Sequence, residues 1–173
     1  MLEQAKATGF FTAVCIDSNG QEKWSTTAEN TVTTVGKNLA LDTYLAGSSY
    51  TVVGPFMGLI SSTSYSAISA SDSMSSHAGW LEAGLANTPT YTGNRKTAAW
   101  SSASSGSKAL SAALSFAITG SGTVKGAFLV YGTGAVATKD DTNGTLYSAG
   151  LFSGGDKTVG NGDTINVSYT ASL

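Results

Sequence analysis

The sequence is poor in the residues from which covalent, metal and redox sites are built. It has one cysteine, Cys15, and one histidine, His77, among 173 residues. A single cysteine excludes an internal disulfide, and one cysteine with one histidine is too few for a typical structural zinc site. Cys15 lies in the apolar run 10–16, which favours a small buried thiol over a reactive one.

Charge is scarce as well. Charged residues make up 12% of the chain, and the formal net charge is −2, whereas about 25% charged residues is typical of soluble domains. This balance offers no electrostatic footprint for nucleic acid. No run approaches the roughly 20 apolar residues of a membrane span, and residues 1–9 lack the apolar core of a signal peptide. We expect neither nucleic acid nor membrane as a partner.

The residue types of a catalytic site are present without the arrangement that catalysis needs. Asp72, Ser76 and His77 lie in one hydroxyl-rich loop, whereas a hydrolytic triad needs rigid elements that hold its members together. Residues 140–144 contain Asp, Asn and Gly as a calcium loop does. They lack the distal glutamate of such a loop, and turn chemistry explains their composition. We predict no catalytic residue, no cofactor and no metal site.

What the chain does contain is alternation of apolar and polar residues. Residues 110–118 and 164–173 are apolar at every second position, which is typical of strands with one buried face. Residues 124–131 are apolar on both faces, which predicts a central strand covered on both sides. Glycines flank Ser121, so we expect 110–118 and 124–131 to form a hairpin.

The N-terminal third predicts a second hairpin, followed by a helix. Residues 10–16 and 21–27 flank an Asn-Gly pair, which is the strongest two-residue signal for a hairpin turn. Thr33 and Thr34 can cap a short helix near residues 35–46, and Gly47 can end it. The spacing of the apolar residues predicts one stripe that packs this helix on the sheet; its members are Leu41, Tyr44 and Leu45.

Together these patterns predict an all-β protein. About eight short strands separated by polar turns favour a jelly-roll or two-sheet β-sandwich with one short α-helix near residues 35–46. We expect an N-terminal arm at residues 1–9 and a single domain at residues 10–173. The serine-rich connection 62–79 is long for a compact domain, and such connections often carry interactions.

Four segments of the chain resemble structural proteins of tailed bacteriophages. Residues 10–47 are similar to a virion motif in which a hairpin is followed by Asn-x-Val-Thr-x-x-Gly and a short helix. Residues 57–84, 89–132 and 157–173 resemble, in that order, small capsid cement or decoration proteins and tail-fibre-like proteins. A Gly-Leu strand, an Arg-Lys strand, a Ser-Gly-Ser-Lys turn and a Gly-Asp-Thr strand recur in these proteins.

The resemblance implies a non-enzymatic capsid cement protein. Such a protein is made in the cytoplasm of the host bacterium and sits on the outer face of the phage head. There it bridges subunits of the major capsid protein, and it is expected to be a homo-oligomer, a dimer or trimer. The residues that we expect at the interface are Met1, Leu2, Phe10, Phe11, Tyr65, Ile68 and Met74.

Two alternatives remain. A tail-fibre or baseplate β-sandwich module would bind a host glycan or another tail protein, although the chain has none of the repetitive shaft that fibres usually carry. A glycan hydrolase is the third possibility. It needs a pair of carboxylates in a cleft, and the acidic residues here cluster in turns.

Overall fold

The computed structural model describes residues 6–45 and 53–172, and within them most of the regular secondary structure is β-strand. One helix, α1 (Thr34–Leu45), follows the second strand. The strands are β1 (Thr8–Ile16), β2 (Glu22–Val32), β3 (Phe56–Ser61), β4 (Glu82–Ala83), β5 (Thr90–Tyr91), β6 (Lys96–Thr97), β7 (Ser107–Ala109), β8 (Leu114–Gly120), β9 (Gly122–Tyr131), β10 (Thr145–Leu151), β11 (Lys157–Val159) and β12 (Thr164–Ser172). This confirms the predicted all-β class with one short helix.

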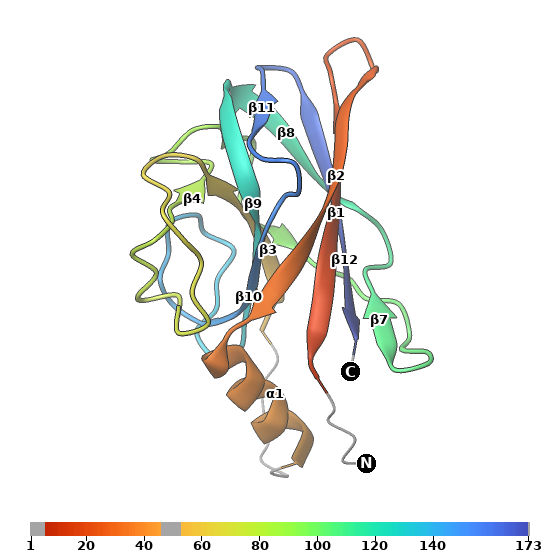
Figure 1. The fold of residues 1–173 in the computed structure, drawn as a ribbon, viewed down its shortest axis with the longest axis vertical. Coiled ribbons are helices and arrows are strands. Elements are labelled where there is room, and N and C mark those ends of the chain that lie inside the picture. The colour runs from red at the N-terminus through yellow and green to blue at the C-terminus, as the bar shows by residue number, and fades with distance from the viewer. Residues whose placement is uncertain (1–5, 46–52, 173) are drawn as a thin grey trace.

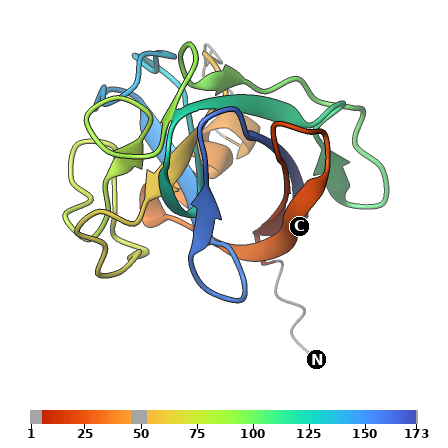
Figure 2. The ribbon, with the colours of Figure 1, turned by 90° about the horizontal axis from the view of Figure 1, so that it is seen from above.

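The strands form one strongly bent antiparallel sheet, which folds into two layers. Its order is β4-β3-β9-β10-β2-β1-β12-β8-β5, and three short strands pair beside this path, β11 with β9, β6 with β3 and β7 with β12. Strand β2 belongs to both layers, because its residues 22–29 pair with β1 and its residues 30–32 pair with β10. Figures 1 and 2 show the result, a sandwich whose strands curve round a common axis so that it approaches a barrel.

The N-terminal hairpin is confirmed, and the second predicted hairpin is wrong. Strands β1 and β2 pair across the 17–21 turn with one irregularity at Cys15/Ile16. Strand β8 pairs with β12 and β5, whereas β9 pairs with β3, β10 and β11. The glycines beside Ser121 therefore carry the chain from one layer to the other instead of folding it back on itself.

The space between the layers holds the main hydrophobic core. Phe11 from β1 and Tyr169 from β12 lie in contact there, with ring centroids 4.6 Å apart. Cys15 is fully buried in the same cluster, and burial together with the charge of Asp163 raises the pKa of its thiol to about 12. The thiol is therefore protonated and unreactive at neutral pH, as the sequence indicates.

A second, smaller core lies on the outer face of β9. Phe128 and Val130 of β9 pack there against Met74 and Trp80 from the 62–80 connection. Trp80 lies 5.2 Å from Phe128 between ring centroids, and its indole nitrogen donates to Asp72 Oδ2 at 2.9 Å. Strand β9 is thus covered on both sides, as predicted. The serine-rich connection packs a few of its apolar side chains onto the sheet, and most of its other residues are exposed.

Helix α1 begins as predicted, but its face differs from the prediction. Thr33 caps it, since the Thr33 hydroxyl accepts a hydrogen bond from the Gly36 amide at 3.0 Å and donates to the Leu146 carbonyl. Leu41 and Leu45 are 55% and 71% exposed, so the predicted stripe does not pack on the sheet. The Tyr44 side chain and Gly47 lie outside the described residues.

Candidate functional site

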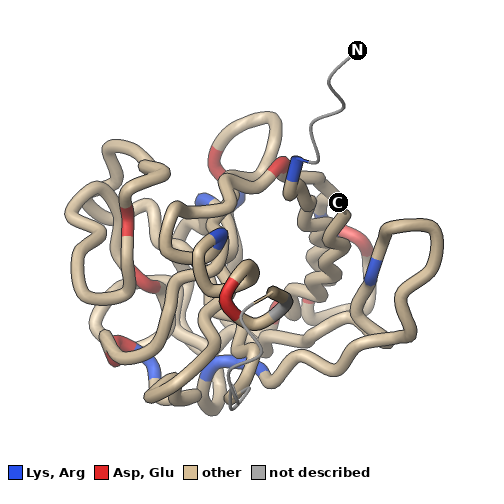
Figure 3. Tube along the Cα trace, turned by 90° about the horizontal axis from the view of Figure 1, so that it is seen from below, with Lys and Arg blue, Asp and Glu red and all other residues tan. Residues whose placement is uncertain are grey.

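The candidate site is an apolar groove at the end of the molecule where α1 lies. Figure 1 places α1 and the described chain ends at this end, and Figure 3 looks onto it from below. The groove has a volume of about 650 Å³ and is bounded by α1, the chain just before β1, the end of β12 and the region of β7. Its apolar lining includes Val32, Leu41, Tyr147 and Ala171.

The local sequence of α1 explains which of its residues face the groove. Lys37, Ala40 and Leu41 line it, and positions i, i+3 and i+4 share one face of a helix. The helix can approach β10 closely because residue 36 is glycine. A Cβ atom at this position would lie 2.4 Å from the carbonyl oxygen of Tyr147. The spacing of large apolar residues does not indicate this face, because two of its three members are lysine and alanine.

A second cavity adjoins the groove. It has a volume of about 340 Å³ and shares Lys108, Tyr147 and Ala171 with the groove. Aromatic rings of Trp100 and Tyr131 also line it, and the Tyr131 and Tyr147 rings meet edge to face at 5.4 Å. Burial raises the pKa of Tyr147, so its phenol is neutral at physiological pH.

Positive charge surrounds the groove. Lys6 precedes β1, Lys37 belongs to α1 and Lys108 belongs to β7, and all three line the groove and are exposed. Among the described residues that line it, none is an aspartate or a glutamate. The ion pairs found in the described part of the chain involve Lys23, Arg95 and Lys125, and none of the three lysines of the groove.

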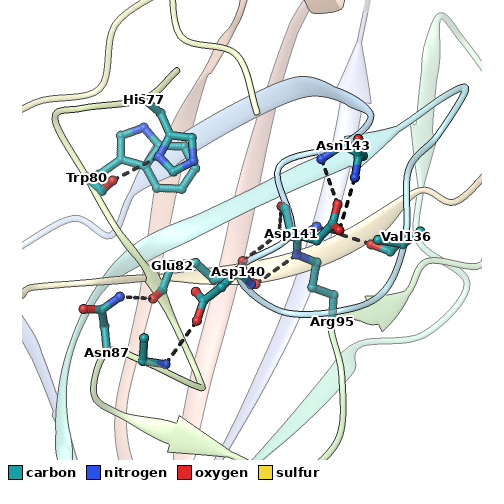
Figure 4. Close-up of polar contacts among 10 residues, drawn as sticks. His77, Trp80, Glu82, Asn87, Arg95, Val136, Asp140, Asp141 and Asn143 are labelled. Carbon is teal, nitrogen blue, oxygen red and sulfur yellow. Dashed lines mark hydrogen bonds and ion pairs between the residues drawn. The ribbon is translucent and has the colours of Figure 1, made fainter. Parts of the chain in front are cut away.

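A buried polar cluster lies elsewhere, beneath the loop between β9 and β10 (Figure 4). Arg95 donates to both carboxylate oxygens of Glu82, and it also donates to the backbone oxygens of Val136 and Asp141. The amide of Asp140 donates to Glu82 at 2.8 Å. Burial raises the pKa of Glu82, against the hydrogen bonds and charge of Arg95, which lower it. Every contact in this cluster holds the loop in place.

The other polar residues that the sequence singled out also make internal contacts. Asp141 accepts a hydrogen bond from the amide of Asn143 at 2.8 Å, which is an Asx turn. The His77 ring stacks on Trp80 at 4.0 Å between centroids, and its Nδ1 donates to the Trp80 carbonyl (Figure 4). Asp72 accepts from Trp80 and from the Ser69 amide. Asp72 and His77 therefore form no catalytic dyad here.

The predicted interface residues are scattered over the domain. Phe10 is 45% exposed beside β2. Phe11 is buried in the main core and Met74 in the second core. Neither side chain is therefore available to a partner. Tyr65 and Ile68 are partly buried against the second core. Met1 and Leu2 lie outside the described residues.

The predicted N-terminal arm is shorter than expected at its C-terminal boundary. Thr8 and Gly9 already belong to β1, where they pair with Ser172 and Ala171. Gly9 lies directly against Tyr169, whose hydroxyl would be 2.3 Å from a Cβ atom at that position. This close contact fixes the start of the strand and leaves residues 1–7 before it.

The described residues offer neither a metal-binding cluster nor a membrane-spanning helix. They hold no cluster of three or more His, Cys, Asp and Glu side chains placed to bind a metal ion. They also hold no helix with the length and hydropathy needed to cross a bilayer.

Comparison of the chain with protein-family models, with curated proteins and with solved structures finds no match. The resemblance to phage decoration proteins therefore rests on the sequence segments named above. The groove at the α1 end is a separate, geometric basis for a proposal about function.

Proposed function

We propose that this protein is a non-enzymatic structural protein of a tailed-phage virion, a decoration protein that binds the outer face of the head and bridges major capsid protein subunits. The observation that carries the proposal is the exposed apolar surface at the α1 end. Leu41 and Leu45 stand 55% and 71% exposed beside an apolar groove of about 650 Å³. A contiguous apolar surface of this kind on a folded domain marks an interaction site.

The remainder of the fold supports a scaffold that presents this surface. Both core clusters are complete without α1's leucines, because they draw on β-strands and on the 62–80 connection. Leu41 and Leu45 are therefore free to be buried against another molecule. Full burial of one leucine contributes about 1.5–3 kcal/mol, and an oligomer that engages several equivalent capsid sites at once would turn this modest contact into tight retention.

A tail-fibre or baseplate module is the second candidate function. The second cavity favours this candidate, because Trp100, Tyr131 and Tyr147 line the cavity with aromatic rings and phenol groups. Such a wall suits the ring of a sugar as well as an apolar side chain. Under this alternative the same opening would receive a host glycan.

The first test is the copy number of the protein in purified virions, measured by quantitative mass spectrometry against the major capsid protein. A ratio near one to one supports the decoration protein. A few copies per particle would move the protein to the tail and favour the second candidate. Its absence from the particle would overturn both.

The second test asks whether the α1 end is the docking surface. Particles lacking the protein are mixed with a Leu41→Ser/Leu45→Ser variant and sedimented. We expect loss of co-sedimentation with unchanged stability. Leu85→Ser is the matched control, since Leu85 is 62% exposed and does not line the groove. Equal binding to particles by the wild type, the Leu41→Ser/Leu45→Ser variant and the Leu85→Ser control would show that the partner docks elsewhere.

A further inference from the structure

We infer, on the basis of the proposed function, that the groove at the α1 end recognises a protein segment that is both apolar and acidic. The segment would place apolar side chains against Val32, Leu41 and Tyr147 and carboxylates beside Lys6, Lys37 and Lys108. The exposed apolar surface alone does not define the charge of a partner, whereas the three lysines do.

The concentration of positive charge is the first support. The whole chain has nine lysines and arginines and a net charge of −2, yet three of the nine line this one groove, and none of the described residues that line it is acidic. These lysines come from three separate parts of the chain, before β1, on α1 and on β7. The fold therefore assembles a positive rim that no short sequence motif encodes.

The apolar floor is the second support, and it distinguishes the partner from a purely polar anion. Long lysine side chains lay their methylene stems on apolar surface while the ammonium groups stay in water. An occupant that satisfies both parts must bury apolar groups and carry negative charge at its edges. The groove volume of about 650 Å³ is within the usual range for specific sites.

The same charges argue against self-association through this face. In a two-fold symmetric dimer the same patch occurs on both partners, so the three lysines of one copy would face the three of the other. Like charges placed opposite one another oppose docking. A different molecule that supplies the carboxylates avoids this repulsion.

The experiment is a titration of the full chain, labelled with ¹⁵N, with three capped hexapeptides followed by NMR. The acidic apolar probe is Glu-Leu-Leu-Glu-Asp-Leu. The two controls are the charge-reversed Lys-Leu-Leu-Lys-Lys-Leu and the polar acidic Glu-Ser-Ser-Glu-Asp-Ser. We expect shifts at the amides of Leu41, Tyr147 and Ala171, with the acidic apolar peptide binding about ten-fold more tightly than either control. Equal affinity for the acidic and the basic apolar peptides would overturn the proposal.

A charge-reversal variant makes the test independent of the chosen peptide. In Lys37→Glu/Lys108→Glu we expect the preference to switch to the basic apolar peptide. Both side chains are exposed, so the variant is expected to fold. Lys157→Glu is the control, because Lys157 in β11 does not line the groove, and it should keep the original preference. A preference unchanged by Lys37→Glu/Lys108→Glu contradicts the proposal.

Other occupants would reveal themselves in the same titration. If groove resonances shift with protein concentration before peptide is added, a second copy occupies the site. If peptide binds only after residues 1–5 are deleted, the chain itself competes for the groove. Tighter binding of dodecanoate than of the acidic apolar peptide would indicate an amphiphile site. Each of these three results overturns the proposal.

The failure of this proposal can be told apart from failure of the proposed function. Virion copy numbers near one to one, with particle binding unaffected by Lys37→Glu/Lys108→Glu, would leave the decoration function standing without the charge recognition. Absence from virions together with the expected peptide selectivity would leave the charge recognition standing without the decoration function.

Discussion

Glu82 and Arg95 form a bidentate ion pair inside the domain, with Arg95 Nε 2.9 Å from Oε1 and Nη2 2.7 Å from Oε2. Their side chains are 4% and 0% exposed. The pair ties β4 to the segment before β6, and through Asp140 and Asp141 it holds the loop that leads into β10. Removing one member leaves the other as an isolated buried charge or polar group.

We therefore expect Arg95→Met to destabilise the protein by about 3–5 kcal/mol. The double variant Glu82→Gln/Arg95→Met should lose less than the sum of the two single variants, because it leaves no unpaired charge. Urea unfolding of the wild type, the two single variants Glu82→Gln and Arg95→Met, and the double variant forms a complete double-mutant cycle. If the losses simply add, Glu82 and Arg95 are not energetically coupled.

Asp163 predicts a specific dependence of stability on pH. Its Oδ2 atom accepts from Lys23 at 2.8 Å, from the Gly160 amide at 2.7 Å and from the Cys15 thiol at 3.8 Å. Burial raises the pKa of this carboxyl, but the hydrogen bonds from Lys23 and Gly160 outweigh burial and hold it below its usual value. Asp163 thus stays ionised in the folded protein at pH values where it is already protonated in the unfolded chain.

The stabilisation from Asp163 should accordingly be complete above its unfolded pKa of about 3.9 and disappear as the pH falls through its lower folded value. Unfolding by urea measured from neutral pH down to the acid limit of folding will show this loss. The asparagine of Asp163→Asn cannot titrate. The free energy of unfolding of this variant should therefore fall less steeply with decreasing pH than that of the wild type. Two superimposable slopes would exclude Asp163 as a source of the acid lability.

Gly58 in β3 leaves room for an aromatic ring on the neighbouring strand. It pairs with Phe128 of β9, and a Cβ atom at residue 58 would lie 2.4 Å from the Cε1 and Cζ atoms of that ring. Gly58→Ala should therefore cost about 1–3 kcal/mol through overpacking. Gly160→Ala is the matched control, since the nearest atom to its added Cβ lies 3.8 Å away. Thermal unfolding compares the two, and equal midpoints would mean that the Phe128 ring moves aside at no cost.

Thr33 links the start of α1 to β10. Thr33→Val keeps the size of the side chain but removes the hydroxyl that caps the Gly36 amide and bonds to the Leu146 carbonyl. Loss of an N-cap typically costs about 0.5–2 kcal/mol. We expect faster hydrogen exchange across residues 34–45, measured by mass spectrometry. Thr34→Val changes an exposed neighbour and should leave exchange nearly unchanged. Identical exchange in the two variants would assign no capping role to Thr33.

The sequence predicts what local chemistry determines. The Asn-Gly turn between β1 and β2, the cap at Thr33 and the double-sided burial of β9 all follow from residue types at fixed spacing. The failed hairpin between β8 and β9 shows the limit of that method. Glycines flanking Ser121 permit a reversal within one layer and a crossing between layers alike, and the choice depends on strands distant in sequence, since β8 pairs with β12 and β9 with β3 and β10.

The groove could not be predicted for the same reason. Leu41 and Leu45 form an apolar stripe, but periodicity does not distinguish a stripe that faces its own core from one left open to a partner. Lys6, Lys37 and Lys108 are unremarkable in the sequence and converge only through the pairing of β1, β12 and β7.

The antiparallel register of β1 with β12, from Thr8 opposite Ser172 to Ile16 opposite Thr164, has a consequence for engineering. Lys6 and Ser172 both line the groove, so a protein fused directly next to either residue would compete with the occupant of the groove. The Asn19-Gly20 turn joins β1 to β2 at the end of the molecule opposite to α1 (Figure 1), and it is exposed. A peptide inserted at that turn would be displayed outward from a surface to which the α1 end is attached.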